Sequence, residues 1–324
     1  MKKLFALILC IVFISSCKKK TEEPPAEEPT PAPVTDCPTC DFPLTKWTST
    51  GTGAKLIFRF KFDSTQVRLN NLGQPTVVAV GNAGQSPVFN GMSAHYIELA
   101  QTDMTPVGGG SVLYRAEETK CGGANAITFC KSVVCKENDT CFSIPFSSIP
   151  PGTYKWLRVS LAYQNYDIRV RVNGQNLTGT IGSFVGFNTY VTKYKMKNAV
   201  MTPTAGGGAG NHLQGYWGFY TSVSGVEYKS DGQAPATTVV NPNFANSPIP
   251  AGSCLVTGEF FNSLIMANAP FVITGSETQD KVITISLSTN KSFEWKEMTF
   301  DGLFEPGINE TVVDMGLRGM IPKY

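Results

Sequence analysis

The sequence predicts an all-β protein built as an antiparallel β-sandwich, and three observations lead to this fold class. Short segments alternate polar and apolar residues with a period of two, and no stretch keeps a helical period of 3.6. Turn-forming residues separate these segments. The chain is 42% hydrophobic but only 16% charged, against roughly 25% charge in an average globular chain, so it has enough apolar material for a core. One polar face per strand is typical of antiparallel sheets.

Ten segments are predicted as strands from this alternation and from their β-branched and aromatic content. They cover residues 58–62, 76–80, 94–100, 111–115, 154–163, 168–172, 215–223, 255–261, 271–274 and 283–287. Turns are predicted at residues 71–73, 150–152, 172–174, 230–232 and 250–252, where Asn, Asp, Pro and Gly gather. Only short helical turns are expected between them. Residues 200–211 are predicted to form a flexible loop, and residues 237–250 an irregular stretch.

The first seventeen residues have the pattern of an export signal. A basic start is followed by an apolar run of eleven residues, 4–14, which is too short for a membrane span of roughly 20 residues but suits a signal sequence. Ser15, Ser16 and Cys17 end the run and resemble the bacterial lipobox. That resemblance implies cleavage before Cys17 and acylation of its sulfur and amino group. The alternatives are an ordinary signal peptide, with Cys17 incidental, and a buried apolar helix.

Residues 18–33 contain lysines, then glutamates, then prolines, and this composition predicts a solvated linker. Charged tethers of this kind resemble those of Bacteroidota surface lipoproteins, which implies a lipid-anchored protein of the outer membrane. Because basic residues precede the acidic ones, the periplasmic face and the cell surface both remain open. The predicted organisation is a signal peptide (1–16), a lipidated linker (17–40), a β-sandwich (41–230) and a β-rich region (231–324), which is either a small second domain or the completing strands of the first.

Seven cysteines remain once Cys10 leaves with the signal and Cys17 carries lipid. An exported chain meets an oxidising compartment, so disulfides are expected. The middle four lie close together in sequence and are predicted to hold two bridges, in any of three pairings. Cys37 and Cys40 are predicted to bridge each other, or to form one bridge with Cys254, with a zinc site as the alternative. An odd count leaves one thiol free or paired outside the chain. The seven are Cys37, Cys40, Cys121, Cys130, Cys135, Cys141 and Cys254.

The charge balance argues against a nucleic-acid partner. The chain has 27 Lys and Arg and 25 Asp and Glu, and removal of Lys2 and Lys3 with the signal leaves 27 − 2 = 25 basic groups. A net charge near zero provides no electrostatic surface for a polyphosphate.

The chain has two histidines, His95 and His212, and both are candidate metal ligands because imidazole suits copper. The structural alternative is that each is an ordinary hydrogen-bonded histidine. Tyr216, Trp217 and Tyr220 are candidates for stacking against a sugar ring, and the alternative is that one face of this aromatic strand belongs to the core.

Part of the chain resembles the MbnP-like periplasmic proteins. The Pro151-Gly152-Thr153-Tyr154 entry to an apolar strand, the aromatic run 215–220, the strand at 58–62 and the turn at 71–73 occur in a comparable order. The resemblance covers about residues 54–225 and implies a β-sandwich fold and, as in some members, a copper site built from histidines and an oxidised tryptophan. Trp217 matches by context. The family pattern has a segment with glycine and aspartate after this strand entry, and residues 161–164 of this chain replace that segment.

Carboxylates gather in the last thirty residues of the chain, and residues 301–305 have some features of a calcium loop without EF-hand spacing. A solvated turn is the alternative. The usual catalytic and nucleotide-binding motifs are not found. We therefore expect a membrane-anchored binding lipoprotein that is not an enzyme and needs no cofactor. The alternatives are a copper-binding lipoprotein and a glycan-processing or glycan-binding protein, and the bilayer is the expected partner through acylated Cys17.

Overall fold

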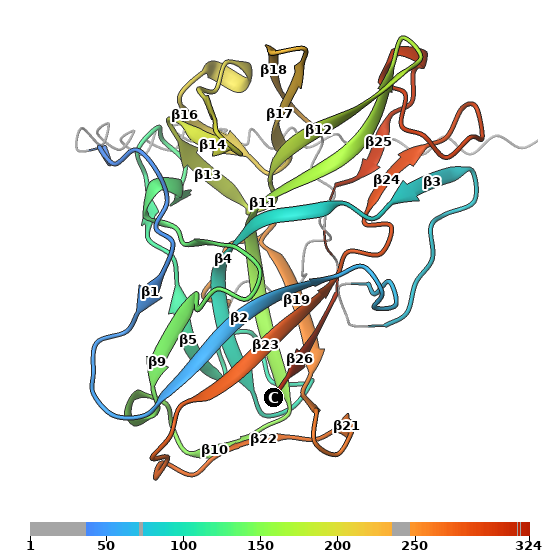
Figure 1. Cartoon of the computed structure of the whole chain (residues 1–324). Helices are drawn as coiled ribbons and strands as arrows, with labels where there is room; N and C mark the ends of the chain where they lie inside the picture. The colour runs from blue at the N-terminus through green and yellow to red at the C-terminus, as the bar shows by residue number, and fades with distance from the viewer. Residues whose placement is uncertain (1–36, 71–73, 235–246, 316, 318) are drawn as a thin grey trace, which may run out of the picture. The chain divides into compact units, whose positions relative to one another are not determined.

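The computed structural model describes residues 37–70, 74–234, 247–315, 317 and 319–324, and these form an all-β sandwich. The predicted signal peptide, Cys17 and the turn at 71–73 lie outside the described residues, as do most of residues 18–40 and 237–250. Two sheets contain most of the strands, and Figure 1 shows them crossing, with β2, β23 and β26 in front of β4, β11 and β19.

The first sheet has seven strands and combines both ends of the described chain. In sheet order the strands are β1 (Trp47–Thr48), β9 (Phe142–Pro145), β2 (Lys55–Asp63), β23 (Lys281–Ser288), β26 (Met320–Lys323), β20 (Phe261–Asn262) and β21 (Ala267–Asn268). Its central pair is β2 and β23, which run parallel from Leu56–Lys281 to Asp63–Ser288.

The second sheet has eight strands around the longest strand of the protein. In order these are β18 (Val226–Gln233), β17 (Tyr216–Val223), β12 (Gln175–Phe184), β11 (Trp156–Val172), β4 (Val88–Ala100) and β5 (Ser111–Arg115), with β19 (Cys254–Glu259) on β11 and β8 (Val134–Cys135) on β4. Because β11 has 17 residues, it pairs with β19 along its first part and with β12 along its second part.

Smaller sheets surround these two. One contains β16 (Gly210–Leu213), β13 (Asn188–Val191), β7 (Ala126–Thr128) and β6 (Glu118–Thr119); another β25 (Val312–Asp314), β24 (Phe293–Lys296) and β3 (Asn82–Gln85); and two pairs are β10 (Gly152–Tyr154) with β22 (Phe271–Ile273), and β14 (Tyr194–Met196) with β15 (Ala199–Met201). The helical turns are η1 (Phe129–Lys131), η2 (Phe146–Ser148), η3 (Ala205–Gly207) and η5 (Pro306–Ile308).

No part of the described chain forms a helix with the length and apolar character needed to cross a membrane.

The main core lies between the two sheets and is built from alternate residues of their strands. β2 contributes Leu56, Phe58 and Phe60, which all have no exposed surface, while the intervening residues of β2 are half-buried. β23 contributes Ile285 and its buried neighbours, and β11 contributes Val159 and its neighbours from the other sheet. The period-two pattern therefore holds in β2, which buries one set of side chains. The long strands β4 and β11 are instead buried on both faces over ten consecutive residues.

Most of the predicted strands are present. The segments at 58–62, 111–115, 168–172 and 283–287 lie in β2, β5, β11 and β23, and those at 94–100, 154–163, 215–223, 255–261 and 271–274 overlap β4, β10 and β11, β17, β19 and β22. The predicted turn at 172–174 is confirmed as the β11–β12 hairpin. Asn173 and Gly174 there have φ values of 50° and 74°, which is the left-handed pair that a two-residue hairpin needs.

Two predictions are wrong. Residues 76–80 form no strand, although they are rich in valine; Val77 is 83% exposed and Val80 fully exposed. β propensity describes how well a side chain packs on a pleated surface, and here no neighbouring strand offers that surface. The predicted turn at 230–232 lies inside β18. Gly232 is needed there because the ring of Trp217 occupies the space of a Cβ atom.

The sheets are not purely antiparallel. The pairs β2–β23, β1–β9, β7–β13 and β20–β26 are parallel, whereas the second sheet is antiparallel throughout. Parallel neighbours require a long connection, and β2 and β23 are joined by more than 200 residues. The C-terminal strands enter sheets that earlier strands begin: β19 pairs with β11, β22 with β10, and β23 with β2.

Candidate functional site

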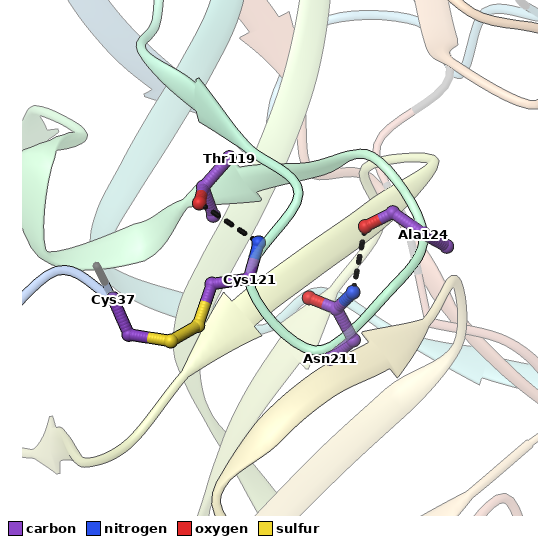
Figure 2. The surroundings of a disulfide bond; sticks show 5 residues. All are labelled: Cys37, Thr119, Cys121, Ala124 and Asn211. Carbon is purple, nitrogen blue, oxygen red and sulfur yellow. Dashed lines mark hydrogen bonds between the residues drawn. A yellow bond between two sulfur atoms is a disulfide. The ribbon is translucent and has the colours of Figure 1, made fainter. Parts of the chain in front are cut away.

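Three disulfides join six cysteines and tie the first described segment to the body of the protein. Cys37 bonds to Cys121 and Cys40 to Cys130, with Cα atoms 5.4 and 5.6 Å apart. Figure 2 shows the first bridge reaching the turn after β6, where the Cys121 N–H donates to Thr119 Oγ1 at 3.0 Å. The third bridge, Cys135 to Cys141, closes a short loop.

The pairing corrects the sequence-based prediction. The middle four cysteines hold one bridge among themselves, not two, and Cys37 and Cys40 bond neither to each other nor to Cys254. The reason is the path of the N-terminal segment, which runs beside η1 and β8: the Leu44 N–H donates to the Ser132 carbonyl at 2.8 Å. The segment that carries Cys37 and Cys40 therefore lies beside the segment that carries Cys121 and Cys130.

Disulfide formation also removes the zinc alternative for these six residues, because zinc binds thiolates. Cys254 begins β19 and is half-buried.

His95 lies on β4 with no exposed surface and is bonded to a carboxylate. Its Nε2 lies 2.9 Å from Glu118 Oε1. The same carboxylate accepts hydrogen bonds from Arg115 Nε at 2.8 Å and from Asn125 Nδ2 at 2.7 Å. Burial of the carboxylate opposes its ionisation, but the hydrogen bonds from His95, Asn125 and Arg115 outweigh burial and lower the pKa of Glu118 to about 2.

Glu118 is therefore ionised at neutral pH and can only accept hydrogen bonds, so His95 donates through its Nε2–H. In the neutral tautomer the lone pair of His95 is then on Nδ1. This atom is buried and has no hydrogen-bond partner. A buried nitrogen without a partner is unusual, and it is the feature of His95 that would suit a metal.

His212 lies on β16 and is 2% exposed. Its Nε2 donates to the Gly208 carbonyl at 2.8 Å, and its ring is stacked on Tyr216 with centroids 4.0 Å apart. Burial lowers the pKa of His212 below its ordinary value, against the opposing effects of the Gly208 carbonyl and of Asp231. Its Nδ1, like that of His95, is buried and has no partner.

The strand register shows that the two histidines do not meet. Glu118 is opposite Ile127, Ile127 is opposite Thr189, and Thr189 is opposite His212. This row crosses three strand spacings, or about 14 Å from Glu118 to His212, and His95 is bonded to the Glu118 end. A single mononuclear site containing both histidines is therefore not formed, and within the described residues no three His, Cys, Asp or Glu side chains form a group that could hold a metal ion.

The three aromatic candidates on β17 do not share a surface. Tyr216 has no exposed surface and belongs to a second core, in which its ring contacts Phe184 and Tyr194. Trp217 and Tyr220 are both half-buried, but they point to opposite faces because residues alternate along a strand. Tyr216 donates to Asp231 Oδ2 at 2.8 Å. Its position supports the core interpretation of that face.

Asp231 and Glu118 are two carboxylates of this network that the sequence analysis did not single out as site residues. Asp231 accepts hydrogen bonds from the side chain and the N–H of Thr204, from the Ala205 N–H at 2.8 Å and from Tyr216. Burial opposes ionisation of Asp231, but these bonds lower its pKa. No sequence motif marks either residue, since the partners that fix their charge include residues brought together by the fold, such as His95 for Glu118 and Thr204 for Asp231.

The loop that carries Cys121 also contacts the strand that carries His212. Asn211 donates from Nδ2 to the Ala124 carbonyl at 2.7 Å, as Figure 2 shows. The Cys37–Cys121 bridge, the turn after β6 and the β16 edge thus form one connected unit beside His212.

The chain was compared with protein-family models, with curated proteins and with solved structures, and none of the three comparisons finds a match.

Proposed function

We propose that the protein is a lipoprotein of the cell envelope, anchored to the outer membrane by acylated Cys17, whose β-sandwich acts as a non-enzymatic binding module on the periplasmic or outer side. The observation that carries the proposal is the sequence at Cys17, where an apolar run of eleven residues ends at two serines and a cysteine. Two acyl chains or more are needed for stable anchoring, and the lipobox modification provides three.

The disulfides support this location. Six cysteines are paired in the structure, and bridges between residues far apart in sequence persist in oxidising compartments and are rare in the cytosol. A bridge that joins Cys37 to the sandwich also suits a chain that hangs from a tether, because it fixes the point where the tether ends.

Metabolic labelling with an alkyne fatty acid tests the anchor. We expect the wild-type chain to incorporate the label and to remain with membranes. Cys17→Ala should lose both, whereas Cys10→Ala, a matched cysteine change in the same leader, should keep both. Labelled Cys17→Ala protein, or loss of label in Cys10→Ala alone, would contradict the proposal.

Metal binding is a second candidate function, and one observation favours it: each histidine keeps a buried Nδ1 without a hydrogen-bond partner. Because the register separates the two side chains and the described residues contain no group of three metal ligands, copper at either histidine would need further ligands from outside these residues. We expect copper to remain with the purified protein and to fall in at least one of His95→Ala and His212→Ala. Metal content by mass spectrometry measures this, and wild-type protein without copper would remove the candidate.

A further inference from the structure

The β20–β21 hairpin ends in three consecutive apolar residues that are largely exposed. Leu264 is 92% exposed, Ile265 63% and Met266 74%. We refer to these three residues as the apolar tip. Single exposed apolar residues are common in proteins, but adjacent large ones are not. The exposed apolar tip therefore indicates a surface that another molecule or a lipid layer covers.

The chain holds this tip in place. The Leu264 N–H donates to Asn262 Oδ1 at 2.9 Å, and the Ser263 N–H donates to the Tyr324 carbonyl at 2.9 Å. Met266 has a φ of 52°, a left-handed conformation that non-glycine residues rarely adopt. The apolar side chains are thus presented by a fixed turn rather than by a loose end.

The tip lies in a segment without charged side chains. Residues 260–276 contain none, although longer uncharged runs, such as residues 232–258, occur elsewhere in this weakly charged chain. Immersion in hydrocarbon is costly for charged groups and favourable for apolar ones. A segment that meets a lipid surface is expected to lack charge in this way.

Two lysines lie on the segments at the base of the hairpin. Lys323 is the strand partner of Phe261, and the Lys155 carbonyl accepts the Phe260 N–H at 2.9 Å. Lysines near an apolar tip suit the interface, where an ammonium group meets phosphate headgroups while the tip enters the acyl layer.

Two carboxylates that flank the uncharged segment, Glu259 and Asp280, are engaged within the protein, whereas Asp103, in the β4–β5 loop, is exposed. Glu259 accepts a hydrogen bond from Asn268 Nδ2 at 2.8 Å, and Asp280 accepts one from the Lys55 N–H at 2.8 Å. Neither belongs to the uncharged segment.

A further exposed apolar residue, Met104, lies in a loop that begins at the same edge of the second sheet. Ala100, the last residue of β4, and Glu259, the last residue of β19, both pair with Trp156. The β4–β5 loop therefore begins two strand spacings, about 10 Å, from the end of β19, and its Met104 is 84% exposed. Figure 1 shows β21 at the end of the molecule away from the β17–β18 hairpin.

We propose that the apolar tip inserts into the lipid bilayer to which the chain is anchored, so that the sandwich lies against the membrane. This inference rests on the proposed anchor at Cys17. Nineteen residues, 18–36, separate Cys17 from the first described residue, and at ~3.1 Å per residue they reach roughly 60 Å. That length allows the hairpin to touch the bilayer. The consecutive side chains of the tip point to different sides of the hairpin, and a bilayer can contact all of them because lipid surrounds an inserted tip.

Tryptophan quenching by brominated lipid tests the insertion. The acylated, full chain is purified from membranes and placed in phosphatidylethanolamine–phosphatidylglycerol vesicles whose acyl chains carry bromine. The variants are Leu264→Trp at the tip and Val226→Trp at the β17–β18 hairpin, a position that is also exposed and apolar at 54%. The signal of the four native tryptophans, measured in the unsubstituted chain, is subtracted.

We expect quenching of Leu264→Trp to exceed that of Val226→Trp several-fold, and to fall to the control level when Ile265→Asp is added. Equal quenching at both positions, or none at the tip, would overturn the insertion, including the case in which the tip instead binds a protein.

Vesicle flotation and the mass of the N-terminal peptide are measured on the same samples. Acylated protein that floats without tip quenching rejects the tip and keeps the anchor, whereas a peptide without acyl mass rejects the anchor whatever the tryptophans show.

Discussion

The first and last parts of the described chain are held in the same sandwich by different means. Residues 37–141 contain all three disulfides, and the strands beside them are short: β1, β6 and β8 have two residues each. The described residues from 247 onward take part in none of these bridges, and β23 is paired over eight residues with β2. The disulfides thus fix the short N-terminal strands to the sandwich, whereas β23 is held in it by a long strand pairing.

The largest expected effect comes from opening a long disulfide loop. Cys40→Ser with Cys130→Ser, made together with Cys37→Ser and Cys121→Ser, removes both bridges between residues 84 and 90 apart, whereas Cys135→Ser with Cys141→Ser removes one between residues 6 apart. On chain entropy alone the losses in the free energy of unfolding are about 7 and about 2 kcal/mol. Urea unfolding measures both. Equal losses would show that the bridges act through local contacts instead.

A core deletion in β23 tests the part without disulfides. Ile285 has no exposed surface and lies in the main core, so Ile285→Ala should lower the free energy of unfolding by about 2–5 kcal/mol. Thr284→Ala, one residue away on the half-buried face, should cost less than about 1 kcal/mol. If the two variants unfolded at the same urea concentration, the proposed role of β23 as the central core strand would fail.

Acid titration tests the carboxylate beside His95. The pKa of Glu118 is lowered from 4.5 to about 2, so its contribution to stability is present above pH 4.5 and is lost as the pH falls from 4.5 to 2. Glu118→Gln should cost about 1–3 kcal/mol at pH 7 and flatten the acid limb of a melting-temperature curve. Glu117→Gln, an exposed neighbour, should leave that limb unchanged; an identical acid limb in Glu118→Gln would argue against the pairing.

The smallest effect has the opposite sign and lies in the C-terminal part. Burial, together with the neighbouring Glu310 carboxylate, raises the pKa of Glu297. Its raised pKa stabilises the fold at low pH, and that stabilisation is lost as the pH rises above 4.5. Glu297→Gln should therefore raise the melting temperature at pH 7, by the equivalent of up to about 1 kcal/mol, and little at pH 4. A melting temperature that falls at pH 7 would contradict this.

Strand positions were predictable because each strand has its own local signal. The alternation at Phe58 and Phe60 and the turn at Asn173 and Gly174 each depend on a few adjacent residues. The parallel pairing of β2 with β23 was not predictable, because an alternating strand has the same pattern in either orientation. The strand predicted around Val77 is absent for a related reason: a high β propensity does not supply a neighbouring strand to pair with.

The site was less predictable than the fold. His95 and His212 were found by residue type, but the roles of Glu118 and Asp231 depend on strand pairing and loop positions that the local sequence does not show. The disulfide pattern also depends on where the segment around Leu44 runs. Spacing in the sequence favoured local bridges, and the fold instead placed Cys37 and Cys40 beside residues far along the chain.

The parallel β2–β23 pair has a consequence for how the protein is made. Synthesis proceeds from the N-terminus, so β2 exists long before residues 281–288 leave the ribosome. Until then, the edge of β2 that β23 will occupy has no strand to pair with, and the phenylalanines of β2 lack the core partners that β23 provides. Such an edge promotes association between chains. A newly made chain therefore needs protection, by a chaperone or by continued transport, until β23 (Lys281–Ser288) has been synthesised and can pair with β2.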